Sequence, residues 1–447
     1  MITKIIHKPI AMKKNFLTIL SLLIATISFS QNSTPRTVIS LEDNWKFINQ
    51  DVEGAENQEL STSTWETVSV PHDWAITGPF DKTIDAQKVR VQQDMEEEAR
   101  LRTGRTGALP HIGVGWYRKT FEVPGFKEGK KVLLTFDGAM SDAHVWVNGK
   151  KVGNHPYGYA YFYFDITGYL KEGDKNLLAV RLENLPFSSR WYPGTGIYRK
   201  VQLIVKHEVN FKHWGTFITT PFLSDEVAKV NIKTEINGEN TMLVTEIKDT
   251  EGKVVATEST DKLFGNQMEQ NIGVPHPKIW SLKEPNLYFA AMKLYQDNEL
   301  KDEQTVRFGI RTVEYERGKG LVLNGEVTKF KGVCLHHDLG PLGAAVNRAA
   351  LKRQLTILKD MGGNAIRSAH NMPSIEQVEL CDEMGILMLA ESFDEWAKPK
   401  VKNGYNRWFD EWAEKDVVNL VRATRNHPSI VMWSAGNEVP DQWGNGS

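Results

Sequence analysis

A carboxylic acid beside a carboxamide, Asn437-Glu438, is the pair of residues in this sequence best suited to acid chemistry. It closely follows residues 430–433, a short continuous apolar run that is typical of a strand buried on both faces. A parallel strand that ends in an acid presents it at the edge where barrel enzymes assemble their sites. Glu438 is therefore a candidate proton donor. The alternative is a solvated loop after a core strand.

Two histidines and an aspartate, His336-His337-Asp338, follow the strand expected at residues 330–335. These residue types also occur in zinc sites. Adjacent residues of a strand point to opposite sides, however, which makes the two histidines a poor ligand pair. We therefore expect no zinc, and we expect His337 and Asp338 to reach a bound substrate.

Three carboxylates, Glu391 and Asp394-Glu395, follow the strand expected at residues 386–390. Carboxylate oxygens are ligands that Mg²⁺ prefers, so these residues could hold that ion beside Glu438. The alternative is that they neutralise Arg367. The chemistry considered below requires no cofactor, and we expect none.

The elements that position these groups alternate between strand and helix after about residue 314. Apolar residues recur at helical spacing over residues 347–361, and Gly362-Gly363 follows as a stop signal. Such alternation predicts a parallel sheet, and the order fits half of a (β/α)₈ TIM barrel. We expect strands at 330–335, 364–367, 386–390 and 430–433 and helices at 347–361, 374–384 and 410–425.

Two β-rich regions precede the barrel part. Asn148-Gly149 separates two short apolar segments, and Asn-Gly readily adopts the positive φ pair of a type I′ hairpin turn. Short strands between turn residues predict a jelly-roll sandwich at 31–206 and an immunoglobulin-like sandwich at 207–313, before the partial barrel at 314–447. We expect the charged insertion 81–106 to be a solvated helix or a long loop, with a role as rim of the substrate cleft as the functional alternative.

The N-terminus has the pattern of an export signal. Lys13 and Lys14 precede an apolar run at residues 16–29 that is too short for a comfortable membrane span. We expect residues 1–30 to be a signal peptide cleaved near Ser30, and the protein to be periplasmic or secreted. No cysteine follows the run, which excludes a bacterial lipid anchor.

The composition is that of an ordinary globular protein. A formal net charge of −2 gives no electrostatic reason to expect nucleic acid or an anionic membrane as partner. The 13 Trp and 12 Tyr offer rings that stack on sugars, although we expect most of them in the sandwich cores. Cys334 and Cys381 are the only cysteines, and we expect two buried free thiols rather than a disulfide.

Several motifs resemble glycoside hydrolase family 2, which includes β-galactosidases, β-glucuronidases and β-mannosidases. The resemblance covers essentially the whole chain after the export signal. The motifs in the barrel part are RNHPSIVMWSAGNE at 425–438 and NAIRSAHNMP at 364–373, followed by 381–385; those in the sandwiches are DAHVWVNGK at 142–150, 164–167, RWYPGTGIYR at 190–199 and 279–288.

The resemblance implies roles for residues at the expected barrel mouth. Glu438 corresponds to the general acid/base, and Asn437 to a residue that hydrogen-bonds the sugar 2-hydroxyl. Arg367 would orient the nucleophilic carboxylate, and His370 would donate to a sugar hydroxyl. The alternatives are a helix-capping salt bridge for Arg367 and a core histidine for His370.

The implied activity is that of a retaining exo-β-glycosidase acting on an oligo- or polysaccharide. We expect β-galactosides first, β-glucuronides second and β-mannosides third. Some large β-galactosidases have a sugar-contacting Asp at about the place of Arg190, and this difference argues against galactose.

The family's nucleophile comes from a later strand, so we expect it beyond residue 447. Asp441 is too close to Glu438 in the chain to lie across a sugar from it. We therefore expect a fragment that is inactive and aggregation-prone alone, because a half barrel leaves an unpaired strand edge. The alternative that is not an enzyme is a non-catalytic carbohydrate-binding protein. The sequence does not indicate an oligomeric state.

Overall fold

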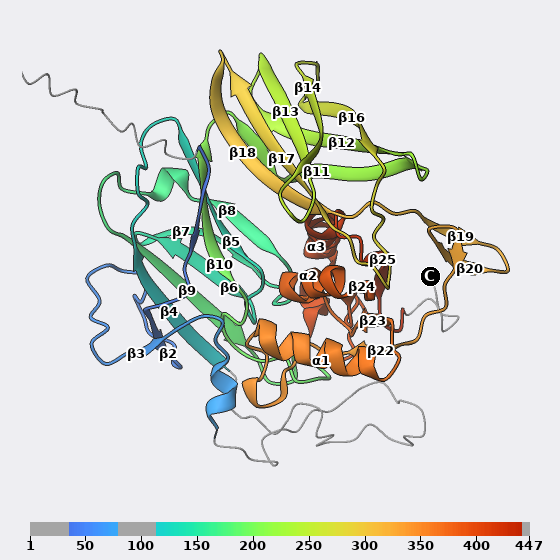
Figure 1. Cartoon of the computed structure of the whole chain (residues 1–447). Coiled ribbons are helices and arrows are strands. Elements are labelled where there is room, and N and C mark those ends of the chain that lie inside the picture. Colours follow the sequence, from blue (N-terminus) through green and yellow to red (C-terminus); the bar gives the residue numbers. More distant parts are fainter. Residues whose placement is uncertain (1–34, 79–112, 440–447) are drawn as a thin grey trace, which may run out of the picture. The chain divides into compact units, whose positions relative to one another are not determined.

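The computed structural model describes residues 35–78 and 113–439 (Figure 1). The expected signal peptide at 1–30, the charged insertion at 81–106 and Asp441 lie outside the described residues. In the part that is described, no helix is both long enough and apolar enough to cross a membrane.

The first β region is a sandwich of two antiparallel sheets that enclose an apolar core. Alternation along its strands explains the layering: β6 alternates between buried and half-buried residues, as expected when one face meets the core. In spatial order, one sheet contains β1 (Thr37–Ser40), β10 (Val201–His207), β5 (Lys130–Phe136) and β8 (Phe162–Asp165); the other contains β3 (Glu66–Val68), β2 (Trp45–Ile48), β4 (Gly113–Phe121), β9 (Asn176–Asn184), β6 (Ala143–Val147) and β7 (Lys150–His155). Short 3₁₀ turns are η1 (Trp74–Thr77) and η2 (Thr167–Tyr169).

The hairpin predicted at Asn148-Gly149 is confirmed. Asn148 has φ 53° and Gly149 has φ 78°, and the turn joins β6 to β7. These positive angles are those that a type I′ turn requires.

The second β region is also a sandwich of two four-stranded antiparallel sheets. One sheet contains β11 (Asn210–Leu223), β12 (Val227–Asn237), β16 (Gln267–Pro275) and β15 (Leu263–Phe264); the other contains β14 (Val254–Thr260), β13 (Thr241–Lys248), β17 (Tyr288–Gln296) and β18 (Glu299–Phe308). A small sheet of β19 (Val313–Glu316), β20 (Gly320–Leu323) and β21 (Glu326–Val327) follows it.

The C-terminal region is a parallel sheet whose strands alternate with helices, coloured orange to red in Figure 1. Its strands are β22 (Gly332–Leu335), β23 (Ala365–Ser368), β24 (Leu387–Phe393) and β25 (Ile430–Gly436), and its helices are α1 (Arg348–Asp360), α2 (Ile375–Met384) and α3 (Phe409–Thr424), with 3₁₀ turns η3 (Gly340–Leu342) and η4 (Tyr405–Arg407). The side chain of Ser374 caps α2, and Gly385 ends it in the left-handed region. The predicted fold class, two sandwiches followed by part of a TIM barrel, is confirmed.

A buried arginine ties the first sandwich to the barrel part. Arg199 is fully buried, and its guanidinium donates to the carbonyls of Asp137 (3.1 Å) and Tyr159 (3.1 Å) in the sandwich. It also donates to the carbonyls of Met372 (2.8 Å) and Pro373 (3.2 Å), in the loop between β23 and α2. One side chain therefore satisfies backbone acceptors of both regions.

Two expectations about burial are wrong. Cys334 is exposed, because β22 is an edge strand paired only with β23, whereas Cys381 is buried as predicted and both thiols are free. The strand at 430–433 is not buried on both faces. Met432 is 37% and Trp433 39% exposed, because β25 pairs only with β24.

Candidate active site

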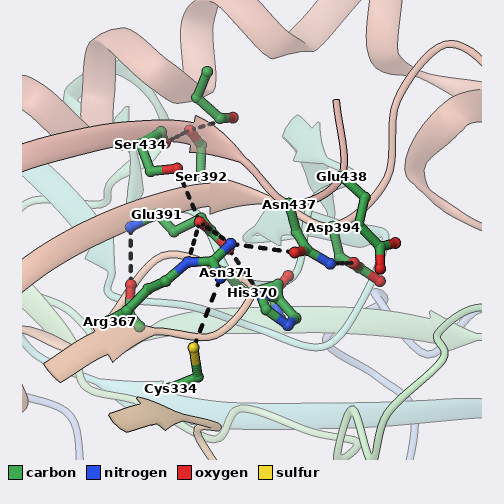
Figure 2. Close-up of polar contacts among 12 residues, drawn as sticks. Cys334, Arg367, His370, Asn371, Glu391, Ser392, Asp394, Ser434, Asn437 and Glu438 are labelled. Atoms are coloured by element: carbon green, nitrogen blue, oxygen red, sulfur yellow. Dashed lines mark hydrogen bonds and ion pairs between the residues drawn. The ribbon is translucent and has the colours of Figure 1, made fainter. Parts of the chain in front are cut away.

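Glu391, on β24, is the centre of a buried ionic cluster (Figure 2). Its side chain is fully buried and accepts two hydrogen bonds from the Arg367 guanidinium, at 2.7 and 2.9 Å. Its oxygens also lie 2.8 Å from His370 Nδ1 and accept from the Ser434 hydroxyl at 2.8 Å. Such a carboxylate, paired and hydrogen-bonded on both oxygens, is fixed in place.

Arg367 pairs with a carboxylate of its own sheet. Within the described residues it binds Glu391 and, through Nη2, the Asn437 Oδ1 at 3.2 Å, and its role in orienting a nucleophile beyond residue 447 stays a prediction. Burial opposes its charge, but the Glu391 carboxylate outweighs this and raises the pKa of Arg367. The alternative that Glu391 neutralises Arg367 therefore describes the structure.

His370 also points at Glu391 through Nδ1. With the hydrogen on Nδ1, a neutral ring leaves Nε2 as an acceptor, and only the charged ring donates from both nitrogens. The role of His370 as a donor to a sugar hydroxyl stays a prediction.

Asn437 joins this cluster to a second one. Its Nδ2 donates to Asp394 Oδ1 at 2.9 Å, while its Oδ1 accepts from Arg367. Figure 2 shows the amide between Glu391 and Asp394. Both ends of the amide thus have protein partners, and its contact with a sugar hydroxyl stays a prediction.

Asp394 and Arg190 form the core of the second cluster. Arg190, from the first sandwich, is fully buried and binds Asp394 through Nε (2.9 Å) and Nη2 (2.5 Å). Burial alone would favour the neutral acid, but Arg190 outweighs it and holds the pKa of Asp394 far below its ordinary value.

Glu438 lies directly beyond β25 with φ 51° and a side chain 30% exposed. Its Oε2 is 2.9 Å from Arg190 Nη2 and 3.0 Å from Lys400 Nζ. Burial favours the neutral form, but these two cations outweigh it, so the pKa of Glu438 lies below its ordinary value. A proton donor requires surroundings that disfavour the charged form, and the described structure has the opposite.

The sequence did not single out Lys400 or the pairing of Arg190 with Asp394. Arg190 and Asp394 are separated by 204 positions, so no local pattern links them. The one signal was the RWYPG segment that begins at Arg190, which belongs to a family motif. Trp433, on the strand that precedes Glu438, donates its indole N–H to the Thr424 hydroxyl on α3 at 3.0 Å.

The histidines after β22 face different ways. His337 packs against Tyr159 and Tyr198 of the first sandwich, and its Nε2 lies 3.1 Å from the Pro193 carbonyl. Burial lowers the pKa of His337 to about 4, which keeps the ring neutral. The structure therefore places His337 in the seam between the two regions rather than beside Glu391.

His336, the residue before it, packs against His370 and Trp191. Asp338 accepts from the Gly340 N–H at 3.5 Å and contacts neither carboxylate cluster. The predicted sugar contacts of His337 and Asp338 stay predictions, and His336 is the histidine that sequence reasoning passed over.

Glu391 on β24 and Asp394 just after it do not fit Mg²⁺, which requires free oxygen ligands. Arg367 and His370 occupy Glu391, and Arg190 occupies Asp394. Across residues 35–78 and 113–439, no group of three or more His, Cys, Asp or Glu side chains is arranged to hold a metal ion.

Comparison with known proteins adds three family matches. Residues 38–207 match the family described as glycosyl hydrolases family 2, sugar binding domain; residues 213–311 match glycosyl hydrolases family 2; and residues 314–445 match glycosyl hydrolases family 2, TIM barrel domain. Together the matches span nearly the whole described chain.

Individual relatives carry two activities in their names. Beta-galactosidase BoGH2A of Bacteroides ovatus is 40% identical over 426 residues, 93% of this chain and 48% of that protein. A beta-glucuronidase of Formosa agariphila is 27% identical over 437 residues, 91% of this chain and 42% of that protein. A crystal structure of a glycosyl hydrolase family 2 member from Bacteroides cellulosilyticus superposes with a TM-score of 0.84 at 35% identity, covering 91% of this chain and 52% of that one. The chain thus spans about half the length of the relatives it matches.

Proposed function

Because the chain belongs to glycosyl hydrolase family 2, we propose that it is part of an exo-acting, retaining β-glycosidase with Glu438 as general acid/base. The observation that carries the proposal is the position of Glu438 directly beyond β25, beside the Arg190–Asp394 pair. Strand ends of this kind are where barrel enzymes hold their reactive groups.

In the proposed reaction, Glu438 first gives its proton to the glycosidic oxygen, the bond from this oxygen to the anomeric carbon breaks, and a second carboxylate bonds to that carbon while the alcohol leaves. Water then attacks the anomeric carbon, Glu438 takes a proton from the water, and the bond to the second carboxylate breaks, which releases the sugar. The described arrangement, with Glu438 ionised between two cations, is the form needed for the second step. A sugar that draws Arg190 away from Glu438 would raise the pKa of this carboxyl for the first step.

The second carboxylate is proposed to lie outside residues 35–78 and 113–439. Within those residues, Glu391 and Asp394 are already committed. Glu391 is bound to Arg367, and Asp394 is bound to Arg190 and Lys400. Both oxygens of each carboxylate accept hydrogen bonds and the side chains are only 0% and 8% exposed, so neither has an oxygen free for a substrate.

We propose a β-galactoside as substrate, which the name and 40% identity of the Bacteroides ovatus relative support. The charges of the site agree with a neutral sugar. Its cations Arg190, Lys400 and Arg367 are all paired with carboxylates. A glucuronide is the second candidate, supported by the name of the Formosa agariphila relative.

Hydrolysis of 4-nitrophenyl β-D-galactoside, β-D-glucuronide and β-D-mannoside tests the proposal. The assay compares the 447-residue chain with any longer product that the genomic DNA encodes. We expect the galactoside to be the best substrate of the product that holds both carboxylates. Binding of oligosaccharide without hydrolysis by every product would instead favour a carbohydrate-binding protein.

We also propose that the protein is exported, on the basis of the charged and apolar pattern at its N-terminus. N-terminal sequencing of the protein recovered from periplasm and medium tests this. We expect the mature chain to begin near Gln31. Recovery from the cytoplasm with the N-terminus intact would contradict export.

A further inference from the structure

Lys400 brings a second buried cation to the candidate acid/base. The residue is only 5% exposed, and it follows β24 in the segment that leads to η4. Its ammonium lies 3.0 Å from Glu438 Oε2 and 3.3 Å from Asp394 Oδ1, and it donates to the Asn437 carbonyl at 3.0 Å. Three acceptors use the three hydrogens of an ammonium group, so the side chain is fully committed.

The turn that delivers Lys400 is closed by its neighbour Glu395. One Glu395 oxygen, Oε2, accepts from the Lys400 backbone N–H at 3.1 Å. The other, Oε1, is buried without a partner in the described part of the chain, and the residue lines a cavity of about 50 Å³ together with Tyr157 and Tyr405. Burial raises the pKa of Glu395 to about 8, so at neutral pH the carboxyl is mostly uncharged.

A second contact fixes the same turn against β25. Trp396 donates its indole N–H to the Asn437 carbonyl at 2.8 Å, the same oxygen that Lys400 binds. The backbone just before Glu438 is thus held from two sides by one turn. The Glu438 side chain therefore has less conformational freedom than that of an ordinary residue beyond a strand end.

The charges show why two cations are needed. Asp394 and Glu438 both contact Arg190 Nη2, so two carboxylates share one cation. Like charges this close disfavour each other's ionised form. Lys400 contacts the same two carboxylates and completes a balanced set of two anions and two cations.

We propose that Lys400 is a positioning residue that holds the Glu438 carboxylate at the barrel mouth and sets its affinity for a proton. The catalytic meaning of this contact rests on the proposed function, but the contact itself can be measured without turnover. Among residues 35–78 and 113–439, the charged groups that face Glu438 are Arg190, Lys400 and Asp394.

Titration of Glu438 by ¹³C-carboxyl NMR in the 447-residue chain tests the proposal, with Glu438→Gln used to assign the signal. In Lys400→Met, which keeps the length of the side chain but removes its charge, we expect the Glu438 pKa to rise so that the protonation equilibrium changes about tenfold or more. Lys400→Arg restores the charge and should keep the value near that of the wild type. Lys398→Met is the matched control, because Lys398 is exposed two residues away.

An unchanged Glu438 pKa in a folded Lys400→Met variant would overturn the proposal. Should that variant not fold, the ¹⁵N signal of the Lys400 ammonium is compared between the wild type and Glu438→Gln. A shift of this signal, with Lys398 unmoved, supports the contact, and no shift overturns it. Failure of the proposed function would appear elsewhere, as absent hydrolysis with the NMR result intact.

Discussion

Two carboxylates at neighbouring strand ends have opposite surroundings. Glu391 lies on β24, which pairs with a strand on each side, and its side chain is fully buried. Glu438 lies just beyond β25, an edge strand in this sheet, and its side chain is 30% exposed. Glu391 contacts Arg367, His370 and Ser434, all of the barrel part, whereas Glu438 contacts Arg190 of the first sandwich and Lys400.

The difference distinguishes a carboxylate that stabilises the fold from one that is placed to react with a substrate. A carboxylate saturated by buried partners stabilises its neighbours but has no free oxygen for a substrate. A carboxylate at the rim, held by side chains from two regions, remains accessible. We therefore expect mutation of Glu391 to act mainly on stability and mutation of Glu438 mainly on turnover.

Glu391→Ala should have the largest effect on stability. It leaves the Arg367 guanidinium, which is 30% exposed, without its carboxylate, so the loss should lie between about 1 kcal/mol and the roughly 3 to 5 kcal/mol of a fully buried pair. Urea unfolding followed by circular dichroism measures the loss. Glu411→Ala, at an exposed acid on α3, is the control and should change stability by less than about 0.5 kcal/mol. A loss below about 1 kcal/mol for Glu391→Ala would remove its supporting role.

Glu438→Gln should lower turnover and cost less stability than Glu391→Ala, because the 30% exposed side chain is replaced by one that still accepts hydrogen bonds from Arg190 and Lys400. Loss of a general acid/base reduces kcat by about 10² to 10⁴-fold on an unactivated β-galactoside. The measurement uses a gene product shown to hydrolyse the substrate, with binding of the sugar followed by calorimetry. Turnover at the wild-type rate would move the acid/base role away from Glu438.

Glu395 should make stability fall as pH rises. Its carboxyl has a folded pKa of about 8, above the ordinary value of 4.5, so the folded protein binds the extra proton between these values. Stability is then full below about pH 4.5 and is lost as pH rises through 8, by about 2 kcal/mol after allowance for solvent screening. Glu395→Gln mimics the neutral acid and should remove this part of the dependence. Melting temperatures at pH 6 and 9 for both proteins provide the comparison, and equal slopes would contradict it.

The smallest effect concerns the edge strand that carries Glu438. Met432 on β25 is 37% exposed, and Met432→Lys should reduce binding of a hydrophobic dye with a stability change below about 0.5 kcal/mol. Val38→Lys, on the edge strand β1 of the first sandwich, is the matched control at 53% exposure. An equal reduction of dye binding in both variants would show that the edge of the barrel sheet exposes no more hydrophobic surface than the edge of the sandwich.

Local patterns predicted the elements of this fold well. The helix expected at 374–384 is α2, because Ser374 caps its start and Gly385 ends it. The strands expected at 386–390 and 430–433 are β24 and β25, because both are apolar runs bounded by polar or small residues. Spacing and stop signals act within a few residues, so a single sequence contains them.

Pairing between distant residues was not predictable in the same way. Neither the Arg190–Asp394 pair nor the Lys400–Glu438 contact follows from spacing, because each depends on how separate elements pack. The two adjacent histidines illustrate the same limit. Neighbouring strand residues face opposite sides, so the sequence alone did not show that His336 lies beside His370 while His337 packs against Tyr159.

Arg199 limits how this architecture can be taken apart. In a chain that ends before the barrel part, the Arg199 guanidinium would lose the carbonyls of the barrel part that it binds. In a barrel part expressed alone, the carbonyls between β23 and α2 would lose Arg199 as their donor. The first sandwich is therefore not independent of the barrel part, and calorimetry should record a single unfolding transition for the two regions together.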